Sequence, residues 1–173
     1  MLAMTEEQFW QIIQRSFDAC SGNIDEQADA LAEELEPLSA EDLLAFDKIW
    51  DQMEDAAFTW ELWGAAYIIN GGCSEDGFCY FSRWLISRGQ HWYETAVKNP
   101  DSLADYPEHL DDETEFEEIG YVAMDIYERK TSSIMPDHDL PNIEEPTGEP
   151  FDEEDDDEFQ RRWPKLYQKY WEN

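Results

Sequence analysis

The stretch that decides the fold is Ala57–Gln90, AFTWELWGAAYIINGGCSEDGFCYFSRWLISRGQ. Its first part, 57–69, is apolar on almost every side, which indicates a helix buried at the centre of the molecule. Asn70, Gly71 and Gly72 end that helix. Ser74 then caps a second helix that runs to Ser87, with two acids in its first turn. The stretch therefore predicts two central helices joined by a tight glycine turn.

Helical spacing of apolar residues continues on both sides of this stretch. Before it, Thr5 and Ser39 are placed as N-caps, and Pro37 separates two of the expected helices. After it, the pattern predicts helices over 90–98 and 113–128. Because no alternation long enough for a sheet occurs, we expect an all-α fold. Residues 5–130 would form a single compact core domain of about six or seven helices.

The composition changes in the last quarter of the chain. Residues 131–158 contain four prolines and end in an unbroken acidic run, so we expect an acidic Pro-rich loop over the surface. The tail 159–173 is basic and aromatic. A basic aromatic segment on an acidic body is expected to dock back onto that body as a helical tail.

The net charge of −32, from 43 acidic and 11 basic residues, limits the classes of partner. Phosphate and anionic lipid would be repelled, so we expect no direct binding of nucleic acid and no membrane binding. The partner that this charge favours is a basic protein. Solubility or a high-salt habitat explains the acidity equally well, and the sequence leaves that alternative open.

Several features predict a cytoplasmic protein. The first ten residues have neither a basic region nor an apolar core, so we expect no signal peptide. No apolar run reaches the length of a membrane span. Cys20, Cys73 and Cys79 are odd in number, which favours reduced thiols in a reducing compartment.

Three runs together carry a resemblance to a known family. They are Trp63-Gly-Ala-Ala-Tyr67, Gly71-Gly-Cys-Ser-Glu-Asp-Gly-Phe78 and Tyr80-Phe-Ser-Arg-Trp-Leu-Ile86, followed by Gly89-Gln90 and, further on, Asn99-Pro-Asp-Ser-Leu-Ala104. With Phe9-Trp10 near the start, they resemble the bacterial family called domain of unknown function 4240, over about 5–130. The resemblance implies a fold and a region of interest but no activity.

The candidate binding site is a polar group among aromatic residues: Trp63, Tyr67, Asp76, Arg83 and Trp84. An arginine beside aromatic rings could receive an anionic group of a ligand or partner. The alternative is structural, because an arginine among so many acids forms an internal ion pair and the aromatic rings form the core. The acids after Ser74 likewise serve the dipole of their helix.

We expect no catalytic residue, no cofactor and no metal. Cys73 and Cys79 are six residues apart without a second cysteine pair, which is not zinc spacing. Buried structural thiols are the simpler interpretation. The triplet Asp137-His138-Asp139 has suitable donor atoms, but its place in the Pro-rich loop predicts a solvated segment.

The resulting hypothesis is a non-enzymatic protein-interaction module that binds a basic partner, as an immunity-type inhibitor or a regulatory adaptor would. The rival hypothesis is an enzyme or small-ligand-binding protein that uses the Trp63/Tyr67/Asp76/Arg83 neighbourhood. It requires a concave pocket with converging polar groups. The oligomeric state is not predicted by the sequence.

Overall fold

Helix boundaries follow the capping residues of the sequence. The side chain of Thr5 accepts a hydrogen bond from the Gln8 amide (3.2 Å), and Gln8 closes a capping box on Thr5. Ser39 and Ser74 cap their helices in the same way, each accepting from the amide three residues on (both 3.1 Å). These three predicted N-caps are confirmed.

The computed structural model describes residues 3–110 and 113–172, and within them the expected all-α fold is confirmed. The core contains α1 (Glu6–Cys20), α2 (Ile24–Leu35), α3 (Ala40–Ala57), α4 (Trp60–Asn70), α5 (Glu75–Ser87), α6 (Gln90–Lys98), η1 (Pro100–Asp105), η2 (Glu118–Tyr121) and α7 (Val122–Thr131). The C-terminal part adds α8 (Asp156–Arg162), α9 (Pro164–Leu166) and the π-helical turn η3 (Tyr167–Trp171).

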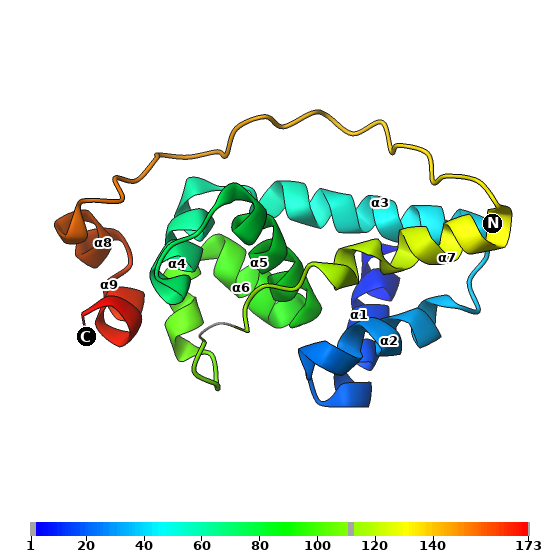
Figure 1. Ribbon diagram of the computed structural model, residues 1–173, viewed down its shortest axis with the longest axis horizontal. Coiled ribbons are helices and arrows are strands. Elements are labelled where there is room, and N and C mark those ends of the chain that lie inside the picture. Colours follow the sequence, from blue (N-terminus) through cyan, green and yellow to red (C-terminus); the bar gives the residue numbers. More distant parts are fainter. Residues whose placement is uncertain (1–2, 111–112, 173) are drawn as a thin grey trace.

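The helices of the core form two neighbouring groups. One contains α1, α2, α3 and α7, the other contains α4, α5 and α6, and α5 contacts α3 and α1 of the first group. Helix α1 packs against α2, and α7 lies along α3 and α2 (Figure 1). Helices α4, α5 and α6 form the second group, at the other end of the long helix α3 (Figure 1). No helix in the described residues combines the length and apolar character needed to cross a bilayer.

The buried central helix begins later than its apolar pattern predicts. It starts at Trp60, because Thr59 is the N-cap and accepts from the Leu62 amide (3.1 Å). The chain before it is extended: Trp60 N donates to Thr147 O (2.9 Å) and Thr147 N donates to Phe58 O (3.1 Å). Ala57 is the last residue of α3, and this isolated bridge to a distant segment holds the chain between the two helices in an extended form.

The helix predicted over 113–128 is wrong in its first half. Regular helix begins only at η2 and α7. The Phe116 amide donates to Tyr80 O of α5 (3.1 Å), and the Phe116 side chain is buried. The segment therefore lies beside α5 in an irregular conformation, because its main chain bonds to Tyr80 while its aromatic ring is buried.

Residues 132–155, called the strap below, run from the end of α7 over α3 to α8 (Figure 1). The strap contacts α3 through His138, whose Nε2 lies 2.7 Å from Asp47 Oδ2. Only 9% of the His138 side chain is exposed. The expectation of a solvated triplet is wrong for His138, because Asp47 gives the imidazole a bonded, mostly buried position.

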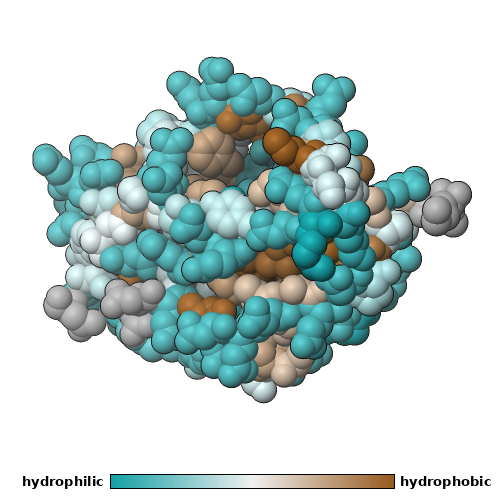
Figure 2. Space-filling model, turned by 45° about the vertical axis from the view of Figure 1, so that its right-hand side comes forward, coloured by the Kyte–Doolittle hydropathy of each residue, from teal (hydrophilic) through white to brown (hydrophobic). Residues whose placement is uncertain are grey.

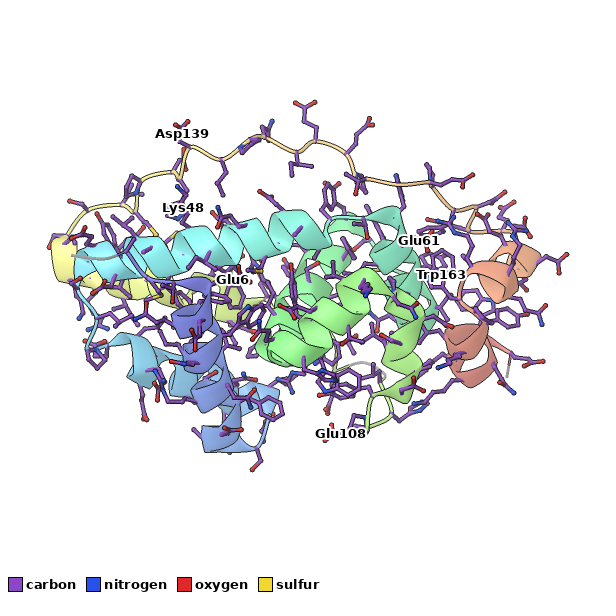
Figure 3. The ribbon with its side chains drawn as sticks, turned by 180° about the vertical axis from the view of Figure 1, so that it is seen from behind. Glu6, Lys48, Glu61, Glu108, Asp139 and Trp163 are labelled. Carbon is purple, nitrogen blue, oxygen red and sulfur yellow. The ribbon has the colours of Figure 1, made fainter. Side chains whose placement is uncertain are left out.

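The C-terminal tail packs on α4. The Trp163 side chain is fully buried, and its Nε1 donates to Glu61 O (2.9 Å). Its ring lies directly over Gly64. Arg162 forms ion pairs with Glu61 and with Glu158. Figure 3 shows Glu61 of α4 facing Trp163 of the tail, so an indole and a guanidinium together hold the tail to the body.

Candidate functional site

Arg83 is bound inside the protein. Its Nε donates to Glu54 of α3 (2.7 Å) and its Nη1 donates to Glu117 O (3.0 Å). The guanidinium also lies over the Tyr121 ring, 4.8 Å from the ring centroid. The internal Arg–Glu ion pair, the structural alternative to a ligand contact, is therefore present.

The other four predicted site residues lie in different surroundings. Trp63 stacks on Phe78 (centroids 5.1 Å apart), and its Nε1 donates to Cys73 O (2.9 Å). Tyr67 packs against the tail, with its ring 5.7 Å from that of Phe159. Asp76 is exposed in the first turn of α5. These three residues lie in the core, against the tail and at a helix start, and the binding role predicted for all five residues stays a prediction.

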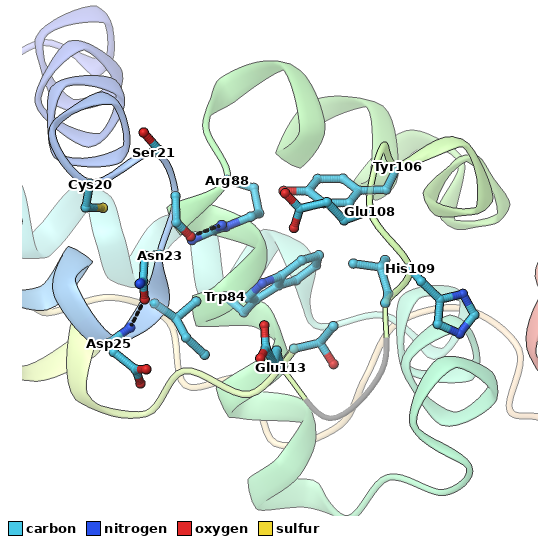
Figure 4. A pocket seen from close by; sticks show the side chains of 14 residues that line it. Cys20, Ser21, Asn23, Asp25, Trp84, Arg88, Tyr106, Glu108, His109 and Glu113 are labelled. Carbon is cyan, nitrogen blue, oxygen red and sulfur yellow. Dashed lines mark hydrogen bonds between the residues drawn. The ribbon is translucent and has the colours of Figure 1, made fainter.

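Trp84 alone of the five lines a concavity whose polar centre is Arg88, called the Arg88 cavity below. This Arg88 cavity has a volume of about 570 Å³ and lies beside the α1–α2 turn and the segment after η1. Figure 4 shows Trp84, Arg88 and Tyr106 forming its inner wall, with Glu108, His109 and Glu113 around it.

Arg88 is the polar centre of this wall and is only 7% exposed. Its Nη1 donates to Gly22 O (2.7 Å), its Nη2 donates to Gln27 Oε1, and its Nε donates to Ser87 Oγ (3.1 Å). All three acceptors are neutral, and no ion pair of Arg88 occurs among the described residues. Within the part of the chain that the structure describes, a buried positive charge thus lies beside the cavity without a carboxylate partner.

Aromatic rings surround the Arg88 guanidinium, and one of them carries a hydroxyl group. The guanidinium carbon lies 5.8 Å from the Trp84 ring centroid and 5.0 Å from that of Phe17. Burial raises the pKa of the Tyr106 phenol, and Arg88 partly opposes that rise. Tyr106 is therefore a neutral hydroxyl at physiological pH, able to donate or accept a hydrogen bond.

The cavity was missed in the sequence because its parts are far apart in the chain. Arg88 and Gly22 are separated by 66 residues, and Arg88 and Gln27 by 61. The signal that could have found it is a polar pair, Gln27 on the inner face of α2 and Arg88 directly after the end of α5. Buried polar groups of that kind need partners, and here they meet each other.

The cysteines show no sign of an activated nucleophile. Burial, and then the nearby Glu115 carboxylate, raises the pKa of Cys73 to about 12. Burial likewise raises the pKa of Cys79. Cys20 lines the Arg88 cavity, but its thiol donates to Ser16 O of its own helix (3.3 Å). Because a protonated thiol is a poor nucleophile, the raised pKa values of Cys73 and Cys79 argue against a nucleophilic role for them, and a bond such as that of Cys20 is typical of a structural cysteine.

Comparison with known proteins gives one match. Residues 4–129, more than half of the chain, match the family described as Protein of unknown function (DUF4240). The search of curated proteins and the search of solved structures gave no match. The match covers α1 to α6 and almost all of α7, with both central helices, and ends before the strap and the tail. The chain belongs to the DUF4240 family.

Proposed function

We propose that the protein is a non-catalytic interaction module whose acidic surface binds a basic partner protein. The observation that supports this proposal is that most of the basic side chains form ion pairs or hydrogen bonds inside the protein. Arg15 pairs with Glu34, Arg83 with Glu54, Arg129 with Glu36, Arg162 with Glu61 and Glu158, and Lys165 with Asp105, while Arg88, Lys130 and Lys169 bond to backbone carbonyls.

The acidic surplus is consequently left on the surface. Most of the 11 basic residues are bonded internally, and they are far too few to balance 43 acids. Figure 2 shows a face dominated by hydrophilic residues, with hydrophobic ones appearing only in small patches between them. A negative field of this size attracts a basic partner and speeds its encounter, whereas it repels nucleic acid.

The strap is the segment best placed to receive such a partner. Glu144, Glu145 and Glu149 are exposed along it. Beside it lies the strap groove, a concavity of about 480 Å³ lined by residues of the strap and of α3. Half of its ten lining residues are acidic: Asp51, Glu54, Asp55, Asp137 and Asp139. A basic side chain entering this groove would meet carboxylates from both of its walls.

The proposal is tested with a labelled Lys/Arg-rich peptide and the full chain, by fluorescence anisotropy at 50 and 300 mM NaCl. We expect binding that weakens as salt rises, because exposed charges are screened. The triple variant Glu144→Gln, Glu145→Gln, Glu149→Gln should bind the peptide more weakly than wild type.

The matched control removes the same three charges from exposed positions of α2, with Glu26→Gln, Asp29→Asn and Glu33→Gln. This variant should bind the peptide almost as wild type does. Binding that is insensitive to salt, or equal losses in the two variants, would count against a partner surface at the strap.

A second candidate function, binding of a small ligand, is supported by the Arg88 cavity. The buried Arg88 cation, which forms no ion pair with the described residues, favours a carboxylate at the inner wall, while Glu108 and Glu113 among the lining residues favour a cationic group elsewhere. A zwitterion such as a free amino acid meets both demands.

This second function is tested by thermal unfolding. Amino acids should raise the melting temperature more than their amides do, and Tyr106→Phe should reduce that rise. Equal shifts with acids and amides would exclude this function.

A further inference from the structure

Two aspartates of α3 and the histidine of the strap converge on one point. Asp47 and Asp51 are four residues apart, so they lie on the same face of the helix. His138 Nε2 lies 2.7 Å from Asp47 Oδ2 and 3.9 Å from Asp51 Oδ2. One donor atom from each of the three residues lies within 4.8 Å of the other two.

The three side chains are sheltered from solvent to different degrees. The exposed fraction is 9% for His138, 15% for Asp47 and 45% for Asp51. The more open Asp51 also lines the strap groove, as His138 does. The donor cluster therefore has a buried side, made by the imidazole and Asp47, and an open side that faces a space large enough for water molecules.

Among the described residues, no lysine or arginine forms an ion pair with Asp47 or Asp51. Asp47 and Asp51 extend from the same face of α3, and Glu54 lines the strap groove together with Asp51. Arg83, a neighbouring arginine, is already bound to Glu54. A cation placed between the aspartates would relieve their repulsion.

We propose that Asp47, Asp51 and His138 bind one divalent transition-metal cation, which fastens the strap to α3. One imidazole nitrogen and two carboxylate oxygens suit Zn²⁺, Mn²⁺, Fe²⁺ or Co²⁺, whereas Mg²⁺ and Ca²⁺ favour ligand sets made only of oxygen. Three protein ligands leave a coordination position for water on the side of the strap groove.

The competing explanation is a cation-free latch, in which the hydrogen bond between His138 and Asp47 alone holds the strap. The two explanations differ in the role of Asp51. At 3.9 Å, Asp51 Oδ2 is too far from His138 Nε2 for a hydrogen bond, so the latch does not need it. The metal site does need it, as the third ligand. Asp51→Asn therefore separates the two.

The test uses the untagged full chain, freed of metal with EDTA and then dialysed, and titrated with ZnCl2 by isothermal calorimetry. Wild type should bind one Zn²⁺ per chain, and Asp51→Asn should weaken binding by about tenfold or more, the range known for loss of supporting groups at metal sites. Asp139→Asn is the matched control, because it removes an exposed groove carboxylate outside the donor cluster and should bind Zn²⁺ as wild type does. All three proteins keep the three cysteines, so adventitious thiol binding is common to them.

A spectroscopic readout identifies the imidazole as a ligand. Co²⁺ added to wild type should give visible absorption bands that are absent from His138→Gln and kept in Asp139→Asn. Far-UV circular dichroism in EDTA checks that each variant is folded. No stoichiometric Zn²⁺ binding by wild type, or equal binding by wild type and Asp51→Asn, would overturn the metal site in favour of the latch. Equal losses in Asp51→Asn and Asp139→Asn would show only diffuse attraction to the acidic surface.

Discussion

Gly120 leaves free the space that the Arg83 side chain occupies. A Cβ added at Gly120 would lie 2.5 Å from Arg83 Nε and 2.6 Å from Cζ. Arg83 cannot easily withdraw, because Glu54 and the Glu117 carbonyl hold its guanidinium. The ion pair between Arg83 and Glu54 thus depends on the absence of a side chain at Gly120, which lies on a different segment.

Gly120→Ala should therefore destabilise the protein by about 1–3 kcal/mol, the usual cost of overpacking. Urea denaturation followed by circular dichroism measures the change. Gly77→Ala in α5 is the matched comparison, because the nearest atom to its new Cβ is the end of the exposed Glu115 side chain at 3.0 Å. Alanine is the better helix former, so this variant should be as stable as wild type or more so. Equal effects of the two substitutions would contradict the role of Arg83.

Cys73 supplies a second prediction at the residue scale, through its pKa of about 12. At pH 8 the thiolate fraction would be roughly 10⁻⁴, against roughly a quarter for an ordinary cysteine. Iodoacetamide should therefore modify Cys73 in the native protein far more slowly than in urea, as peptide mass spectrometry can show. The native rate should rise about tenfold for each unit of pH. Rapid native labelling at pH 8 would show that the thiol is not suppressed.

At the scale of elements, the contact between the tail and α4 depends on Gly64. A Cβ at this position would lie 2.2 Å from two atoms of the Trp163 ring, which is fully buried. Phe159 is also fully buried and packs on Tyr67. The aromatic tail thus packs on α4 at the place where Gly64 leaves room for the Trp163 ring.

Gly64→Ala should displace the tail, although alanine by itself favours the helix. We expect faster proteolysis and faster hydrogen exchange in 159–172, with a loss of stability of about 1–3 kcal/mol. The control is a chain ending at Glu158. In that shorter chain Gly64→Ala has no Trp163 to displace, so it should cause no loss. If Gly64→Ala lowered the stability of both chains equally, the loss would arise within α4 and not from the displaced tail.

At the scale of the whole molecule, the net charge of −32 opposes folding through self-repulsion. The melting temperature should rise when NaCl is increased from 20 to 500 mM, because salt screens repulsion between exposed carboxylates. The rise should shrink as the pH falls from 8 to 5 and carboxylates begin to take up protons. Differential scanning calorimetry at both pH values checks this. A melting temperature independent of salt at pH 8 would show that the repulsion is already balanced.

The local pattern of the sequence determined most of the secondary structure. The caps at Thr5, Ser39 and Ser74 and the two central helices follow from neighbours within four or five residues, so they can be predicted without knowledge of the fold. The internal pairing of Arg83 was also predictable in kind, because arginine is scarce and acids are abundant. The predictions failed where a distant segment intervened, as Thr147 does beside Thr59 and Tyr80 does at Phe116.

Only the tertiary structure decided which side chains meet. Arg88 reaches Gly22 across 66 residues, and His138 reaches Asp47 across 91. Helical periodicity says which face of a helix is buried but not which helix or loop covers it, because packing partners are chosen by the shape and chemistry of the whole core. The apolar pattern therefore determined that this acidic chain is helical, whereas the packing of distant segments decided that a histidine in its Pro-rich loop lies between two aspartates.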